Sequence, residues 1–142
     1  MKKGKTFEEL AVGMTVSIQN VVSEQDVTDF ARVSGDHNPL HLDEEYARTT
    51  VFGGRIAHGA LSASYISAVL GNDLPGPGAV FLELNLKFVR AVRIGNTVVS
   101  TAEVIEMIER GHRVKLSVKG EVEGKIVMRG EATVMVPSGK PA

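Results

Sequence analysis

Cysteine is absent from the 142-residue chain, which excludes disulfides, thiolate metal sites and a cysteine nucleophile. No apolar run approaches the length of a membrane span, and the first residues do not resemble a signal peptide. The chain also lacks an excess of either charge, since it has 16 basic and 17 acidic residues. The net charge of −1 gives no electrostatic reason to expect nucleic acid or an anionic membrane as a partner. We therefore expect neither partner, and a cytoplasmic location.

The composition that remains is typical of one globular domain. Hydrophobic residues make up 43% of the chain, which argues against disorder. A chain of this length can bury a sizeable core. Repeats, linkers and low-complexity segments are not found in the sequence. A single domain over residues 1–142 is predicted.

The first half of the chain predicts one strand and then helices. The stretch Thr15–Val22 is rich in β-forming residues and predicts the first strand. Ser23 is typical of a helix N-cap, Asp26 occupies the capping-box position, and Gly35 is expected to end this helix. Residues 60–70 then carry no charged side chain, which predicts a helix buried on every side.

The second half of the chain predicts strands. Apolar and polar residues alternate over 82–88 and 114–119, and β-branched residues dominate 97–107 and 127–136. Short connections between these segments imply antiparallel hairpins. The sequence predicts one early strand, a helical middle and four strands in meander order. The simplest packing is an α+β arrangement, with a curved antiparallel sheet around the buried helix.

The run from Gly35 to His41 (GDHNPLH) is the most informative part of the sequence. Proline lacks an N–H and disfavours the helical region for the residue before it, so the run is predicted to be a turn rather than regular helix. An Asp and a His on a stiff turn can hold one water between an acceptor and a proton carrier, which suits the addition or removal of water. The alternative is a polar loop whose side chains satisfy only local backbone groups.

A second polar segment, Ala57-His58-Gly59, begins the uncharged helix. The start of a helix presents free N–H groups and a partial positive charge, which stabilise negative charge on an oxygen. Glycine lets the backbone approach a ligand closely because it has no Cβ. A water held at one segment and an oxyanion donor at the other is the pattern required to hydrate an activated carbonyl compound.

Together the two segments, DHNPLH at residues 36–41 and AHG at residues 57–59, resemble the hydratase 2 motif of (R)-specific enoyl-CoA hydratases and MaoC-like dehydratases. The resemblance covers essentially the whole chain and implies the hot-dog fold, an antiparallel sheet wrapped around a long central helix. It is closest to small members that supply (R)-3-hydroxyacyl-CoA for polyhydroxyalkanoate synthesis. It implies reversible hydration of trans-2-enoyl-CoA by a homodimer, with no cofactor beyond the CoA of the substrate.

The resemblance also implies roles for single residues. Asp36 and His41 match the catalytic pair that activates the water, and Gly59 matches the residue whose N–H binds the thioester carbonyl oxygen. Four further residues match positions that support or shape the site: Asn38, Pro39, His58 and Ser67. His58 could instead donate to a local carbonyl, and Ser67 could be a buried hydroxyl bonded to its own helix. His37 fills a variable position of the motif and is given no role.

A metal site is not expected. His37 and His41 have the i, i+4 spacing of helical zinc ligands, but Pro39 lies between them and is expected to break that helix. The sequence shows no third matching ligand nearby except carboxylates.

Two other functions stay open beside the hydratase. A hot-dog acyl-CoA thioesterase would direct the water at the carbonyl carbon, but such enzymes generally place a carboxylate in the central helix, and residues 60–70 contain none. A non-catalytic acyl-CoA-binding hot-dog protein would be expected to lose Asp36 or His41, and both are present. Delivery of the acyl group by CoA or by an acyl carrier protein is also left open.

Overall fold

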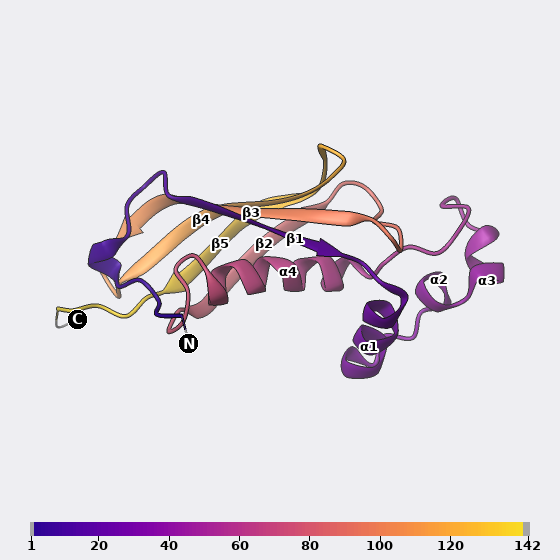
Figure 1. Cartoon of the computed structure of the whole chain (residues 1–142), viewed down its shortest axis with the longest axis horizontal. Coiled ribbons are helices and arrows are strands. Elements are labelled where there is room, and N and C mark those ends of the chain that lie inside the picture. The colour runs from indigo at the N-terminus through magenta and orange to yellow at the C-terminus, as the bar shows by residue number, and fades with distance from the viewer. Residues whose placement is uncertain (1, 141–142) are drawn as a thin grey trace.

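A five-stranded antiparallel sheet lies over one long helix, as Figure 1 shows for the computed structural model. The structure describes residues 2–140, so residues 1, 141 and 142 of the expected domain lie outside it. The strands are β1 (Thr15–Val21), β2 (Val80–Phe88), β3 (Thr97–Ile108), β4 (Arg113–Val122) and β5 (Lys125–Met135). The helices are η1 (Phe7–Glu9), α1 (Glu24–Ser34), α2 (Pro39–Leu42), α3 (Glu44–Arg48) and α4 (Gly59–Asn72). The predicted α+β class and hot-dog fold are confirmed.

The order of strands in the sheet differs from the predicted meander. The order is β1-β3-β4-β5-β2, with every neighbouring pair antiparallel. The hairpins that join β3, β4 and β5 agree with the prediction, whereas β2 pairs with β5 at the far edge instead of with β3. The connection from β2 to β3, residues 89–96, is too long for a tight hairpin. Its Val92 carbonyl accepts from the Ala57 N–H at 2.7 Å, so the connection runs beside the start of α4.

Helix α4 buries only one of its faces in the chain. Ile66 and Val69 are fully buried on the side that packs against the sheet, where every second one of the first eight residues of β3 is buried. The opposite face, which includes Ala60, Ser64 and Ser67, is exposed. The prediction of a helix buried on every side is therefore wrong for the single chain. Because residues 60–70 carry no charge, the exposed face of α4 could still be buried by a partner.

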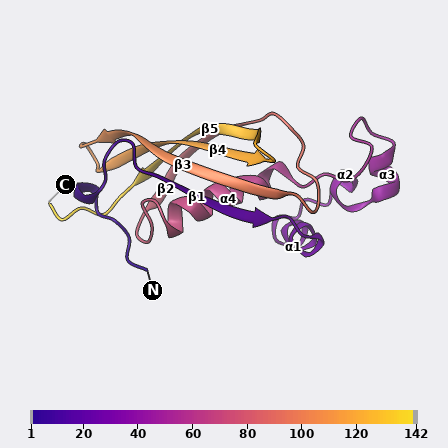
Figure 2. The same cartoon turned by 45° about the horizontal axis from the view of Figure 1, so that its top comes forward.

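Helices α1, α2 and α3 gather beyond one end of the sheet, where α4 begins (Figure 2). The capping box predicted for α1 is present, with the Asp26 N–H donating to Ser23 Oγ and the Ser23 N–H donating to Asp26 Oδ2, each at 3.0 Å. Gly35 ends α1 as predicted. The chain thus leaves α1 toward the start of α4, which brings the two motif segments to the same end of the molecule.

Among residues 2–140, the helices are all too short or too polar to cross a membrane.

Candidate active site

Asp36 comes directly after the end of α1. Gly35 adopts a left-handed φ of 80°, which glycine reaches without strain, and this turns the chain away from the helix axis. The Asp36 N–H donates to Ser34 Oγ at 3.0 Å, and a carboxylate oxygen of Asp36 accepts from the Asn38 N–H at 3.2 Å. The residue is exposed, so the rest of its carboxylate can still bind a water or a substrate group.

Asn38 and Pro39 begin a single helical turn. Asn38 Oδ1 caps α2 by accepting from the Leu40 N–H at 3.0 Å, and Pro39 occupies the first helical position. Proline suits that position because its missing N–H would have no partner there and its fixed φ is helical. The prediction of a turn without helix is therefore wrong for residues 39–41, which belong to α2. It holds for Asn38, whose ψ of 123° is not helical. His41 lies on this capped turn.

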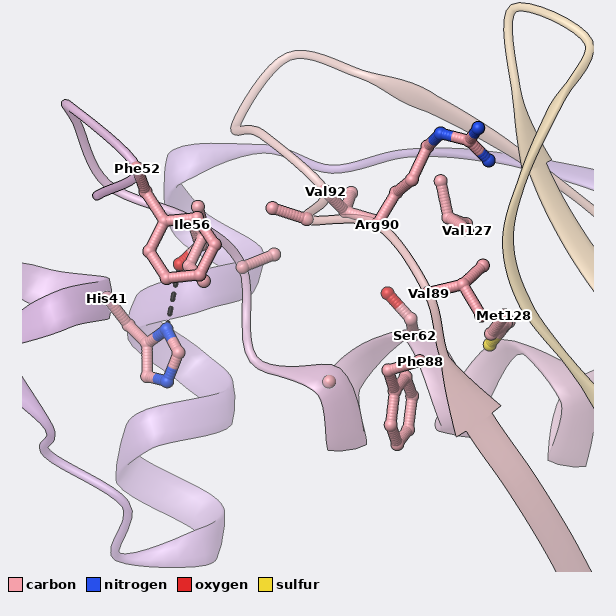
Figure 3. A pocket seen from close by; sticks show the side chains of 13 residues that line it. His41, Phe52, Ile56, Ser62, Phe88, Val89, Arg90, Val92, Val127 and Met128 are labelled. Carbon is pink, nitrogen blue, oxygen red and sulfur yellow. Dashed lines mark hydrogen bonds between the residues drawn. The ribbon is translucent and has the colours of Figure 1, made fainter. Parts of the chain in front are cut away.

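His41 is buried and lines a cavity, with 8% of its surface exposed. Its Nδ1 lies 2.8 Å from the carbonyl oxygen of Ile56, the contact drawn in Figure 3. A carbonyl oxygen can only accept, so Nδ1 carries the proton and Nε2 of the neutral ring keeps a lone pair. The geometry prepares His41 to take a proton from a water.

His58 is fully buried between two other rings. Its ring centroid lies 4.0 Å from that of His41 and 4.9 Å from that of Phe30. Nε2 lies 3.1 Å from the carbonyl oxygen of Asp36, the bond to a local carbonyl that was one of the two alternatives for this residue. Burial lowers the pKa of His58; the bond to the Asp36 carbonyl opposes this, and repulsion from His41 adds to it. A neutral His58 thus supports both the Asp36 loop and the His41 ring.

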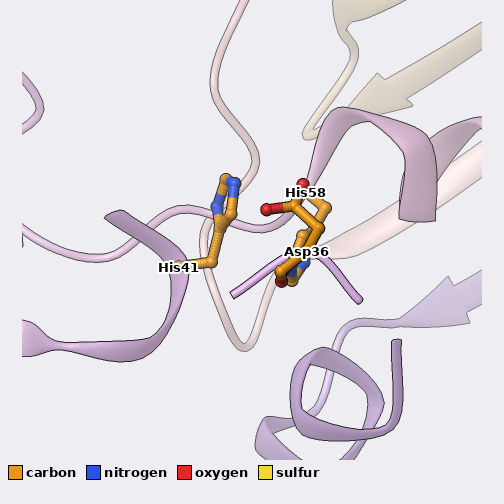
Figure 4. A group of neighbouring side chains, drawn as sticks. All are labelled: Asp36, His41 and His58. Atoms are coloured by element: carbon orange, nitrogen blue, oxygen red, sulfur yellow. The ribbon is translucent and has the colours of Figure 1, made fainter. Parts of the chain in front are cut away.

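The side chains of Asp36, His41 and His58 form one cluster (Figure 4), in which a ligand atom of each lies within 4.8 Å of the others. A water placed between two such atoms can form ordinary hydrogen bonds of about 2.8 Å to both. Carboxylate oxygens and imidazole nitrogens are also the atoms that bind zinc. The sequence did not reveal that His58 lies close enough to Asp36 and His41 to be a third ligand. However, Nε2 of His58 is bonded to Asp36, and Nδ1 is sealed from solvent. The structure nevertheless brings three possible ligand residues together where the sequence indicated only two.

The cavity beside His41 has a volume of about 420 Å³ and reaches the start of α4. Gly59 is the first residue of α4, so its N–H has no acceptor within the helix and is available to a ligand. A Cβ on Gly59 would lie 3.4 Å from the Phe88 ring, so a larger side chain would narrow the cavity. Most of the wall is apolar: Phe52, Ile56, Phe88, Val92, Val127 and Met128. The site joins a possible base, a free N–H and an apolar cavity.

Ser62 is a site residue that the sequence analysis missed. It is 2% exposed and lines the cavity, and its Oγ has no hydrogen-bond partner among the described residues (Figure 3). It lies three positions after Gly59 and thus on the same helix face, a spacing that could have indicated it. Ser67, by contrast, is exposed and outside the cavity wall, because it lies on the face of α4 that points away from the sheet. Its burial is not observed in the single chain, and its supporting role stays a prediction.

Known proteins similar to this chain cover nearly all of it. The MaoC like domain matches residues 7–126, which include Asp36, His41, His58, Gly59 and Ser62. An (R)-specific enoyl-CoA hydratase from Rhodospirillum rubrum is 49% identical over 132 residues, which cover 93% of this chain and 92% of the relative. A 3-hydroxybutyryl-CoA dehydratase from Methylorubrum extorquens is 46% identical over 136 residues, which cover 96% of this chain and 87% of the relative. The unliganded R-hydratase PhaJ1 from Pseudomonas aeruginosa superposes with a TM-score of 0.90 at 40% identity, covering 98% of this chain and 92% of its own.

Proposed function

Because this chain belongs to the MaoC-like domain family, we propose that it adds water reversibly to a trans-2-enoyl-CoA and forms the (R)-3-hydroxyacyl-CoA. One observation carries the proposal: Ile56 holds Nδ1 of His41, which leaves Nε2 free on a ring that lines the cavity and clusters with the Asp36 carboxylate. The (R) configuration is supported by the name of the Rhodospirillum rubrum relative, an (R)-specific enoyl-CoA hydratase.

In this proposal the start of α4 activates the substrate. The thioester carbonyl oxygen accepts from the Gly59 N–H, and the partial positive charge of the helix start draws electron density toward that oxygen. The conjugated Cβ then becomes electrophilic. Because the thioester itself takes up the electron density, the reaction needs no cofactor, and CoA is part of the substrate.

Asp36 and His41 then act on one water. The carboxylate and Nε2 orient the water, the pair takes its proton as the oxygen attacks Cβ, and a proton returns to Cα on the same face. Dehydration is the same sequence in reverse. Asn38, Pro39 and His58 serve the pair by holding the turn, through the cap on α2 and the bond from His58 to the Asp36 carbonyl.

Ser62 supplies a second polar contact in this proposal. A buried hydroxyl without a partner costs free energy, and the apolar wall around it offers no replacement. We assign its partner to a polar atom at the thioester end of the substrate, since Ser62 lies on the same helix face as Gly59.

The proposed active form is a homodimer whose sheets join edge to edge through β2. This strand is an edge of the sheet and exposes Val80, Leu82 and Phe88. An exposed apolar edge invites pairing with another strand, and the uncharged outer face of α4 would be covered by the same partner. Such a partner would bury Ser67, which could then support the site. We also propose that the dimer acts in the cytoplasm, without nucleic acid or membrane as a partner.

We further propose that no metal takes part, because the proposed hydration needs only the Asp36 and His41 pair and the Gly59 N–H. Dialysis against a strong chelator should leave the hydration rate unchanged. A lost rate that zinc restores would contradict this proposal and make His41 a ligand rather than a base.

The decisive experiment follows the loss of enoyl-thioester absorbance with trans-2-enoyl-CoA substrates of increasing chain length. Coupling to (R)- and (S)-specific dehydrogenases then identifies the product, and we expect a signal with the (R)-specific enzyme alone. His37→Ala is a matched control, because His37 is an exposed neighbour of Asp36 outside the cavity wall and should be dispensable. Release of free CoA without hydration would indicate the thioesterase instead.

A further inference from the structure

Arg55 connects α1 with the turn that carries His41. Its Nη1 and Nη2 donate to the two carboxylate oxygens of Glu24 at 2.8 and 3.0 Å. Its Nε donates to the backbone carbonyl of His41 at 2.7 Å. We propose that Arg55, oriented by Glu24, is a positioning residue that fixes His41 for catalysis. The proposal rests on the hydratase function proposed above.

Helix α2 cannot hold His41 in place by itself. It has four residues, and an isolated helix of that length is unstable in water. The carbonyls of its last turn lack partners within the helix, and the His41 carbonyl is one of them. Arg55 supplies a charged donor to this oxygen, and hydrogen bonds from charged groups are stronger than neutral ones. The turn therefore depends on Arg55 for its geometry.

The residue after Arg55 holds the other end of His41. The Ile56 carbonyl accepts from the imidazole at 2.8 Å, and the Ile56 N–H donates to the Leu40 carbonyl at 3.4 Å. Arg55 and Ile56 thus bind the backbone and the ring of His41 together. A shift of Arg55 would move the Ile56 carbonyl and change both the direction and the tautomer of the imidazole.

Glu24 gives Arg55 its fixed orientation. A two-pronged guanidinium–carboxylate contact sets the plane of the guanidinium and hence the direction in which Nε points. Glu24 is the first residue of α1, where the helix dipole favours a negative charge, and the capping box fixes that end of the helix. The Arg55 side chain is 15% exposed, so the contact is partly shielded from solvent. Lysine has one compact ammonium and cannot make both contacts.

Kinetics of single and double variants test the positioning role. Arg55→Ala should lower kcat by about 10- to 100-fold, because a small misplacement of a catalytic group costs rate on that order. KM should change little, since Arg55 does not line the cavity. Arg55→Lys should recover little of the rate. In a His41→Ala background, Arg55→Ala should cost nothing further, because residues that act through one another are non-additive. Independent, multiplying losses would overturn the proposal.

A charge exchange separates positioning from stability. Glu24→Arg combined with Arg55→Glu restores opposite charges at the two positions, but the His41 carbonyl then lacks its donor. This double variant should regain only part of the melting temperature that Arg55→Ala loses, because a positive charge at the start of α1 opposes the helix dipole, while kcat stays as low as in Arg55→Ala. Recovery of kcat together with the melting temperature would overturn the proposal, because Arg55 would then act only through stability.

Nitrogen NMR of the unliganded protein provides a test that does not depend on activity. His41 should show the Nδ1–H tautomer alone in the wild type and both tautomers in Arg55→Ala. Arg113→Ala is the matched control, since Arg113 on β4 donates from Nε to the Arg110 carbonyl at 3.2 Å, outside the site, and should leave His41 unchanged. A pure Nδ1–H signal in Arg55→Ala would overturn the proposal. If the wild type failed to hydrate enoyl-CoA, the proposed function would fail, and these spectra would still decide the role of Arg55.

Discussion

His41 donates from Nδ1 to the carbonyl oxygen of Ile56 across 2.8 Å, and this bond fixes which ring nitrogen can act as a base. Ile56 stands directly before Ala57-His58-Gly59, the segment that begins α4. The same short stretch of chain therefore orients the base and presents the free N–H of the helix start. The two motif segments form one site because this stretch contacts both.

Asp36→Asn and a change at His41 should each lower kcat/KM on crotonyl-CoA by about 10²- to 10⁴-fold, the usual contribution of a general acid–base group. The double variant should be little worse than the worse single one, because both residues act on one water. His41→Asn is preferable to His41→Ala, because the asparagine amide can still donate to Ile56. Near wild-type rates in a folded single variant, checked by thermal melts, would contradict the assignment.

Ser62→Ala should separate activity from stability. Removing an unpaired buried hydroxyl should leave the free energy of unfolding unchanged or raise it by up to about 1 kcal/mol. Losing its bond to the substrate should lower kcat/KM by roughly 2- to 13-fold, as for a neutral hydrogen bond. Ser100→Ala is the matched control, because Ser100 is equally buried and unpaired but lies on β3 outside the cavity wall. Equal kcat/KM in the two variants would show that Ser62 does not contact substrate.

The features predicted correctly from the sequence depend on neighbouring residues. The capping box of Ser23 and Asp26, and the end of α1 at Gly35, are decided within a few positions of the chain. The position of β2 in the sheet is decided by its pairing with β5, in which Leu84 lies opposite Ala132. No local sequence pattern encodes which strand β2 pairs with. A prediction from periodicity therefore gave the strands but not their order.

In the site, too, residues marked by a local spacing could be predicted, whereas residues whose role depends on distant contacts could not. Asp36, His41 and Gly59 could be found because fixed spacings mark them in the sequence. Arg55 could not, since its role depends on Glu24, which lies 31 positions away. Ser62 stands in an uncharged run that reads as helix core, and only the cavity beside it reveals a polar role.

Leu82→Lys should disrupt the proposed dimer. Leu82 lies on the edge strand β2 with 50% of its surface exposed, and a lysine on a strand edge opposes pairing with another sheet. Light scattering should give a monomer mass for this variant, with reduced hydration. Val21→Lys is the control, because Val21 is similarly exposed on the opposite edge strand β1 and should leave the dimer intact. A fully active wild-type monomer would count against the dimer.

His58 should make the protein less stable as the pH falls. Burial lowers its pKa in the folded protein below the value of about 6.5 that histidine has in an unfolded chain. Well above that pH both states hold a neutral imidazole, and His58 contributes no pH dependence. Below it the unfolded chain takes up the proton first, so the free energy of unfolding falls by up to about 1.4 kcal/mol per pH unit until the folded form is also protonated.

Urea unfolding between about pH 8 and pH 5 measures this slope. His58→Gln should flatten it, because glutamine keeps a neutral donor near the Asp36 carbonyl and does not titrate. His37→Gln should change the slope less than His58→Gln does, because repulsion from His37 is the smallest of the causes that act on the pKa of His58. If His58→Gln and the wild type lost stability in parallel, the acid sensitivity would have to come from groups other than His58.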